Sequence, residues 1–286
     1  RYFVQQGEPL KVDLIVTDLD GNPVEDRPIQ VQAARLEWKY QDGRWQEVEA
    51  DLQERVVLIG GATGALGTAV ARVFAATGAR LALASTSPEE LEELADELSV
   101  PDERLFVSTV DATDPESVDQ LASEIAGRFG SLHILANTIG GWGGGKTVAE
   151  TSVEEWEWML TLNLRSAFLL SRAVLPHMLD AGWGRILHTS SKTAEQARAK
   201  EVGYGVAKRG LIALTETIAA EVKGRGVTAN VVLPSIIDTP ANRRMISSAD
   251  PSRWVAPQAI GETMRFLCSD AARSINGESI RIYGDV

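Results

Sequence analysis

The chain of 286 residues has few of the side chains that build disulfides and metal centres. It contains one cysteine, Cys268, and three histidines, His133, His177 and His188. One cysteine excludes an internal disulfide and most cysteine-based zinc sites, and the histidines lack the spacing of metal ligands. We therefore expect no metal site and interpret the histidines as structural. Cys268 lies in the apolar helical pattern MRFLCSDAA, which predicts a buried thiol rather than a nucleophile.

Positive charge and long apolar runs are also scarce. The chain has 28 Lys and Arg against 40 Asp and Glu, and the net charge of −12 argues against nucleic acid or an anionic membrane as a partner. The longest uncharged run, residues 56–71, is rich in glycine, and the first residues lack the apolar stretch of a signal peptide. These features, with the lone cysteine, predict a cytoplasmic globular protein.

The first 52 residues differ in pattern from the remainder. They are β-rich, and an Asp-Gly pair joins EWKY to RWQEV, which predicts a hairpin. About four strands are too few for a complete sandwich. The segment weakly resembles a fragment of a bacterial α2-macroglobulin-like β-sandwich domain. We expect residues 1–52 to be a small β-rich appendage without catalytic groups.

Residues 54–286 alternate between buried strands and amphipathic helices, one of them with Ser87 as its N-cap and Pro88 in its first position. This rhythm predicts an α/β domain with a Rossmann-type, doubly wound parallel sheet and helices on both faces. GGATGALG, residues 60–67, lies between the first strand and its helix. Such a loop places backbone N–H groups and a helix N-terminus around a pyrophosphate, although a glycine-rich turn without a ligand remains an alternative on this motif alone.

Polar residues follow the next strands, whose carboxyl ends line the ligand crevice of an open parallel sheet. Asp111 follows the third strand, and Asn137 and Gly140 follow the fourth, although alone Asp111 fits a helix N-cap and Gly140 a turn. The second strand ends at Ser85 and Thr86, where an acid would favour NAD and a base NADP. Two hydroxyls without a carboxylate lean toward NADP(H) over NAD(H).

A helical pattern places Tyr204 and Lys208 four residues apart on one helix face. A nearby ammonium favours the phenolate, so we expect Lys208 to lower the pKa of Tyr204. Such a tyrosine donates a proton to a carbonyl oxygen, or accepts one from an alcohol, near neutral pH. The pair predicts general acid/base chemistry, provided that the chain also supplies a cofactor site and a third polar group.

These motifs, together with LNLRSAF, GRILHTSS and LPSIIDTP, resemble the short-chain dehydrogenase/reductase family in order and spacing over residues 54–286. The resemblance implies that Ser191, 13 residues before Tyr204, holds the substrate oxygen, and that Asn163 supports a water-linked proton path through Lys208. It implies dinucleotide contacts at Gly61, Thr63, Gly64, Leu66, Gly67, Ser85, Thr86, Asp111, Ala112, Asn137, Gly140, Tyr204, Lys208, Pro234, Ile237 and Thr239. Ala65 in place of the middle glycine, and Thr138 and Ile139 after Asn137, depart from the family pattern and put the geometry of these loops in doubt.

Two loops should cover the nicotinamide end of the site. Residues 140–146 carry Trp142 and residues 238–257 carry Trp254, and a tryptophan can stack on a flat substrate ring. Packing against the domain is the alternative, which we favour for Trp254. The loops resemble those of dihydropteridine reductase, which implies a quinonoid pterin beside Trp142. That enzyme, however, lacks the serine at the position of Ser191 and carries an acid at the end of the second strand.

We therefore predict an NAD(P)-dependent oxidoreductase that acts on a small carbonyl or alcohol substrate and works as a homodimer or homotetramer. Reduction of a quinonoid pterin is the second candidate. A non-catalytic dinucleotide sensor or scaffold is the alternative of another class, and it would not need Ser191, Tyr204 and Lys208 together.

Overall fold

The computed structural model describes residues 36–41, 44–49, 52 and 55–285. Strands β1 (Leu36–Gln41) and β2 (Arg44–Glu49) pair in an antiparallel two-stranded sheet. These are the two strands of the hairpin predicted from the sequence. The other strands predicted for the appendage fall in residues 1–35, outside the described residues.

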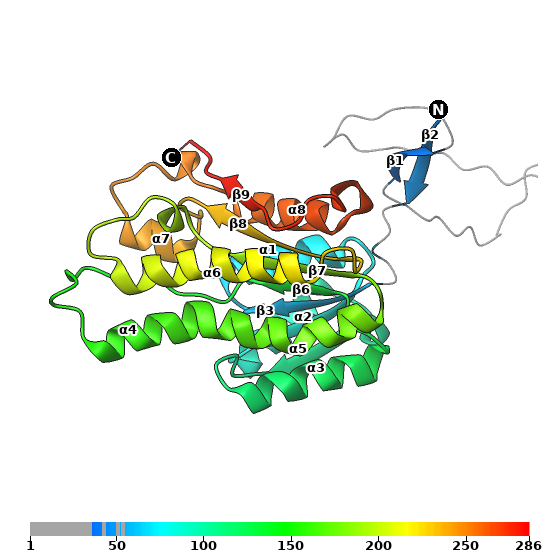
Figure 1. Ribbon diagram of the computed structural model, residues 1–286, viewed down its shortest axis with the longest axis horizontal. Helices are drawn as coiled ribbons and strands as arrows, with labels where there is room; N and C mark the ends of the chain where they lie inside the picture. The colour runs from blue at the N-terminus through cyan, green and yellow to red at the C-terminus, as the bar shows by residue number, and fades with distance from the viewer. Residues whose placement is uncertain (1–35, 42–43, 50–51, 53–54, 286) are drawn as a thin grey trace, which may run out of the picture. The chain divides into compact units, whose positions relative to one another are not determined.

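A seven-stranded parallel sheet in the order β5-β4-β3-β6-β7-β8-β9 forms the centre of the main domain (Figure 1). Its strands are β3 (Val56–Gly60), β4 (Arg80–Ser85), β5 (Leu105–Thr109), β6 (Ile134–Asn137), β7 (Gly184–Thr189), β8 (Val227–Pro234) and β9 (Ser279–Ile282). The strand order reverses between β3 and β6, and ligands bind at such a switch point in open α/β sheets. The predicted Rossmann-type fold is confirmed.

Helices cover both faces of this sheet. One group comprises α1 (Ala65–Ala75), α2 (Pro88–Leu98) and α8 (Pro257–Cys268). The other comprises α3 (Pro115–Phe129), α5 (Ser166–Asp180) and α6 (Val202–Glu221), with α5 and α6 in front of the sheet in Figure 1, and α4 (Val153–Leu160) packs against α6. The short α7 (Pro240–Met245) lies in the loop after β8. No helix in the described part of the chain is long and apolar enough to cross a membrane.

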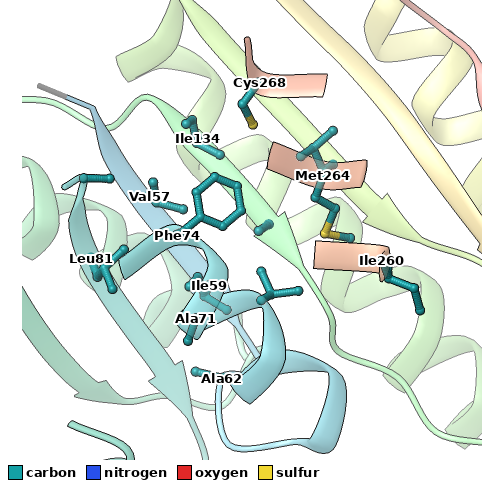
Figure 2. Close-up of a cluster of buried hydrophobic side chains, with 14 of the residues drawn as sticks. Val57, Ile59, Ala62, Ala71, Phe74, Leu81, Ile134, Ile260, Met264 and Cys268 are labelled. Carbon is teal, nitrogen blue, oxygen red and sulfur yellow. The ribbon is translucent and has the colours of Figure 1, made fainter. Parts of the chain in front are cut away.

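Side-chain alternation along the strands builds one apolar core on each face. Val57 and Ile59 of β3 pack toward α1 and α8, where Figure 2 shows Phe74 and Met264 among them, whereas Leu58 packs on the opposite face. Cys268 belongs to the first core, and burial raises the pKa of its thiol to about 12. The thiol is therefore buried, as predicted, and not a ready nucleophile.

Leu52, the last residue of the predicted appendage, is also part of this core, with 4% of its surface exposed. Its carbonyl accepts a hydrogen bond from the backbone N–H of Arg55 at 3.0 Å. The apolar core of the dinucleotide-binding fold therefore begins just before the predicted boundary at residue 54.

Candidate active site

The glycine-rich loop connects β3 to α1 and leaves the start of that helix open. Gly61 has a φ of +77°, and a Cβ on Gly67 would lie only 2.0 Å from the carbonyl oxygen of Gly61. Only glycine fits this close approach. Gly64, the N-cap of α1, provides no side-chain cap, and residues 64–67 line the main cavity. The unpaired N–H groups and positive end of the helix dipole fit a pyrophosphate.

The ends of β4 and β5 carry the polar groups predicted beside the adenosine. The hydroxyls of Thr63 and Ser85 are 2.6 Å apart, and Thr86 is exposed. The Asp111 carboxylate accepts hydrogen bonds from the hydroxyl and backbone N–H of Thr113 at 2.7 and 2.8 Å, and these bonds lower the pKa of Asp111. The N-cap of α3 is Asp114, so the helix-cap alternative for Asp111 is wrong. Ala112 beside it is buried.

Asn137 is buried at the end of β6 and holds the loop that follows it. Its Oδ1 accepts from the N–H of Ile139 at 3.1 Å, and its Nδ2 lies 3.2 Å from Nδ1 of His188. Nε2 of His188 lies 3.1 Å from the hydroxyl of Ser171, which donates to the carbonyl of Ala167. Burial lowers the pKa of His188 to about 3, so this histidine is neutral and structural.

Gly140, Asn163 and Lys208 meet behind this loop. A Cβ on Gly140 would lie 2.8 Å from both Oδ1 of Asn163 and Nζ of Lys208, so a larger residue would displace one of them. Asn163, in the π-helical turn between α4 and α5, accepts from the N–H of Gly141 and donates to the carbonyls of Gly141 and Met159, each at 3.1 Å. Its amide therefore fixes the loop next to Lys208.

The predicted catalytic pair lies on α6 with Ser191 beside it. Nζ of Lys208 donates to the carbonyl of Thr189 at 2.9 Å and lies 5.8 Å from the centroid of the Tyr204 ring. The side chain of Ser191 hydrogen-bonds that of Tyr204. Ser190 is buried and donates to the carbonyl of Lys208 at 2.7 Å. The structure therefore brings Ser191, Tyr204 and Lys208 together and gives Ser190 a packing position.

Burial controls the ionisation of this pair. It raises the pKa of Tyr204, against the opposing effect of the hydrogen bond with Ser191, and it lowers the pKa of Lys208 to about 8. The expectation that Lys208 lowers the pKa of Tyr204 is wrong for this geometry. The ammonium is directed at the Thr189 carbonyl, and desolvation of the phenolate outweighs the neighbouring charges.

A cavity of about 520 Å³ joins the glycine loop to these residues. Of the predicted site residues, its wall includes Gly64, Leu66, Gly67, Gly140, Trp142, Ser191, Tyr204, Lys208, Pro234, Ile237 and Thr239. Trp142 is 48% exposed there. Trp254 is only 8% exposed and lies outside the wall, which agrees with the packing role favoured for it and not with the candidate substrate contact.

The predicted residues Gly61, Thr63, Ser85, Thr86, Asp111, Ala112, Asn137 and Asn163 are likewise not in the wall of this cavity. Sequence reasoning missed several wall residues, namely Lys192, Thr193, Arg198, Glu201, Asn242, Met245 and Ile246. They lie in two stretches, 192–201 and 242–246, that adjoin predicted positions in the sequence. For the stretch 192–201, the available signal was its place in the 13-residue interval between Ser191 and Tyr204. A segment that joins two residues of one site must pass along that site.

Comparisons with known proteins agree with this geometry. A family model described as enoyl-(acyl carrier protein) reductase matches residues 61–284. D-threitol dehydrogenase of Mycolicibacterium smegmatis is 32% identical over 258 residues, which cover 84% of this chain and 96% of that protein. The 3-oxoacyl-[acyl-carrier-protein] reductase FabG of Escherichia coli is 30% identical over 242 residues, with 82% and 98% covered. This chain belongs to the short-chain dehydrogenase/reductase family.

The solved structure of a short-chain dehydrogenase from Bacillus anthracis superposes with a TM-score of 0.74 at 27% identity, covering 82% of this chain and 96% of that one. The family membership confirms the predicted enzyme class, an NAD(P)-dependent oxidoreductase of alcohol and carbonyl groups that acts on small molecules. It also sets aside the non-catalytic sensor or scaffold.

Proposed function

We propose that this protein reduces a carbonyl group, or oxidises the corresponding alcohol, in the cavity between the glycine loop and α6. The observation that carries this proposal is the meeting of Ser191, Tyr204 and Lys208 at the wall of one cavity whose other end is the open N-terminus of α1. A nicotinamide dinucleotide, when bound, supplies or accepts the hydride.

Tyr204 is the proton donor in this proposal. Its raised pKa keeps the phenol protonated at neutral pH, which suits transfer of its proton to a carbonyl oxygen in the reductive direction. Ser191 hydrogen-bonds Tyr204 and is placed to hold the same substrate oxygen. Lys208, with a pKa of about 8, is mostly charged at pH 7, and its ammonium lies 5.8 Å from the centroid of the Tyr204 ring in the same cavity wall.

For the dinucleotide, we propose that the N–H groups of residues 65–67 bind the pyrophosphate and that the β4 end binds the adenosine ribose. The hydroxyls of Thr63 and Ser85 lie together there, and Thr86 is exposed beside them. Hydroxyls can donate to a 2′-phosphate, and the strand end lacks the carboxylate that would repel it. We therefore favour NADP(H) over NAD(H).

A second candidate, reduction of a quinonoid pterin, is favoured by Trp142. This side chain is nearly half exposed in the cavity wall, where a flat ring could stack on it. The hydrogen bond between Ser191 and Tyr204 instead supports a substrate oxygen held by two hydroxyls, which is why we place the carbonyl reaction first.

The deciding experiment assays a panel of ketones, alcohols and quinonoid pterin with both cofactors, following absorbance of the reduced nicotinamide. On a carbonyl substrate, Ser191→Ala should lower kcat by about 10²–10³-fold, because it removes a donor to the developing oxyanion. Trp142→Ala should then have a small effect, as should the control Trp158→Ala, an exposed tryptophan outside this cavity. A large Trp142 effect with a small Ser191 effect would make the pterin reaction the better proposal.

We further propose that the enzyme is a homodimer or homotetramer in the cytoplasm. Phe168 is 47% exposed, and with Leu160 and Leu164 it lines a groove at the junction of α4 and α5. A second copy of this chain would cover these apolar side chains. The free thiol of Cys268 suits a reducing compartment.

A further inference from the structure

The wall of the main cavity differs in charge from the protein as a whole. The chain carries a net charge of −12. The wall, in contrast, contains three cationic side chains, Lys192, Arg198 and Lys208, against one acid, Glu201. A cavity with an excess of one charge concentrates ligands of the opposite charge, even on a protein of the wrong overall sign. This wall therefore favours an anionic ligand.

Arg198 differs from the other charged groups of the wall. Lys208 is bonded to the carbonyl of Thr189, and the amine of Lys192 lies 5.0 Å from the centroid of the Tyr283 ring. Arg198 is exposed and, within the part of the chain that the structure describes, makes no hydrogen bond or ion pair. Its guanidinium is thus free to bind a ligand.

The position of Arg198 ties it to the reacting groups. Its charge acts on Tyr204, whose pKa it lowers against the larger effect of burial. Two residues later, Lys200 has a φ of +67°, an uncommon conformation for a residue with a side chain, and its carbonyl accepts from the N–H of Gly145 at 2.8 Å. This bond ties the segment to the loop that carries Trp142, and Arg198 and Trp142 line the same cavity as Tyr204.

We propose that Arg198 binds a carboxylate of the substrate, so that the preferred substrate is an oxo acid or the corresponding hydroxy acid. The inference rests on the proposed carbonyl or alcohol reaction at Tyr204. A guanidinium presents parallel N–H donors that match the two oxygens of a carboxylate, and it stays charged at every working pH. Binding the carboxylate there places the rest of a short substrate against Tyr204 and Ser191, which lie in the same wall.

The test compares matched pairs of an oxo acid and its methyl ester, such as 3-oxobutanoate and methyl 3-oxobutanoate, with a longer pair beside them. Wild-type enzyme should prefer the acid by about tenfold or more in kcat/KM. Arg198→Gln should lower kcat/KM for the acid by about 10–100-fold, mainly through KM, because it removes a charge-assisted hydrogen bond. The ester should change by less than about threefold, and Arg198→Lys should restore part of the loss.

Arg209→Gln serves as the matched control, because Arg209 is an exposed arginine of α6 outside the cavity wall. It should leave both substrates unchanged. Two results would overturn the inference while leaving the proposed carbonyl reaction intact. The first is an equal loss of kcat/KM for acid and ester in Arg198→Gln. The second is a wild-type enzyme that prefers the esters or accepts only neutral ketones. Weaker equilibrium binding of NADPH by Arg198→Gln would also overturn it, since the arginine would then serve the cofactor. No turnover of any carbonyl or alcohol would instead reject the proposed reaction itself.

Discussion

The parallel sheet has an amino edge, where its strands begin, and a carboxyl edge, where they end. The two edges carry similar side chains that have different roles. At the amino edge, the guanidiniums of Arg55 and Arg185 lie 4.0 and 4.1 Å from the centroid of the Trp183 ring. His133 meets the same tryptophan edge-on at 6.2 Å. The carboxyl edge likewise gathers cations and aromatic rings, but around a cavity.

The difference lies in what satisfies the charges. At the amino edge, the Trp183 ring contacts both guanidiniums and Arg185 also donates to the carbonyls of Gly184 and Gly226, whereas Nε of Arg55 and Nε of Arg185 are buried without a hydrogen-bond partner in the described part of the chain. Burial is the main reason that the pKa of His133 falls to about 4. At the carboxyl edge, glycine loops keep the backbone open and Arg198 faces the cavity without a protein partner in the described chain. We infer that the first edge stabilises the fold and the second binds ligands.

The largest effect is expected from a substitution that removes catalysis at the carboxyl edge and leaves the amino edge unchanged. Tyr204→Phe keeps the aromatic ring and removes the transferable proton, so kcat should fall by about 10²–10⁴-fold. The free energy of unfolding and the dissociation constant of the dinucleotide should change little. Steady-state kinetics and a binding titration on the same preparation check this. Turnover close to that of the wild type would remove Tyr204 from the mechanism.

The converse change concerns the amino edge. Trp183→Leu removes the ring that contacts both guanidiniums, two like charges that act on each other, so the free energy of unfolding should fall by about 2–3 kcal/mol. Denaturant unfolding gives this value, and kcat/KM of the folded enzyme should stay within about twofold. Trp158→Leu, at an exposed position, is the control and should cost less than about 0.5 kcal/mol. A stable but inactive Trp183→Leu would contradict the division between the edges.

Much of the fold could be predicted because its signals are local. Buried strands, the glycine loop and the Ser87 cap lie within single elements, and the Ser87 side chain does accept the N–H of Glu90. The same holds for Tyr204 and Lys208, which share one helix.

The rest of the site depends on contacts between distant segments. Asn137 bonds His188, 51 residues away, and Asn163 bonds Gly141, 22 residues away, so neither partner could be deduced from spacing. The pKa of Tyr204 depends on burial, which no motif encodes. Arg198 lies in a connecting segment whose path around the cavity is set by tertiary contacts such as the bond between Lys200 and Gly145.

The smallest effect is expected on cofactor preference. It tests the part of the carboxyl edge at the end of β4, which lies outside the cavity wall. Ser85→Asp introduces a carboxylate where Ser85 now meets Thr63 at 2.6 Å. An acid there bonds a ribose and repels a 2′-phosphate, so the ratio of kcat/KM for NADPH over NADH should fall by about tenfold or more. Ser87→Asp is the matched control, because Ser87 is the N-cap of α2 and aspartate caps equally well. If Ser87→Asp shifts the ratio as much as Ser85→Asp, the effect is a general one of added charge. A wild-type enzyme that strongly prefers NADH would show that the hydroxyls of Thr63 and Ser85 do not select the phosphate.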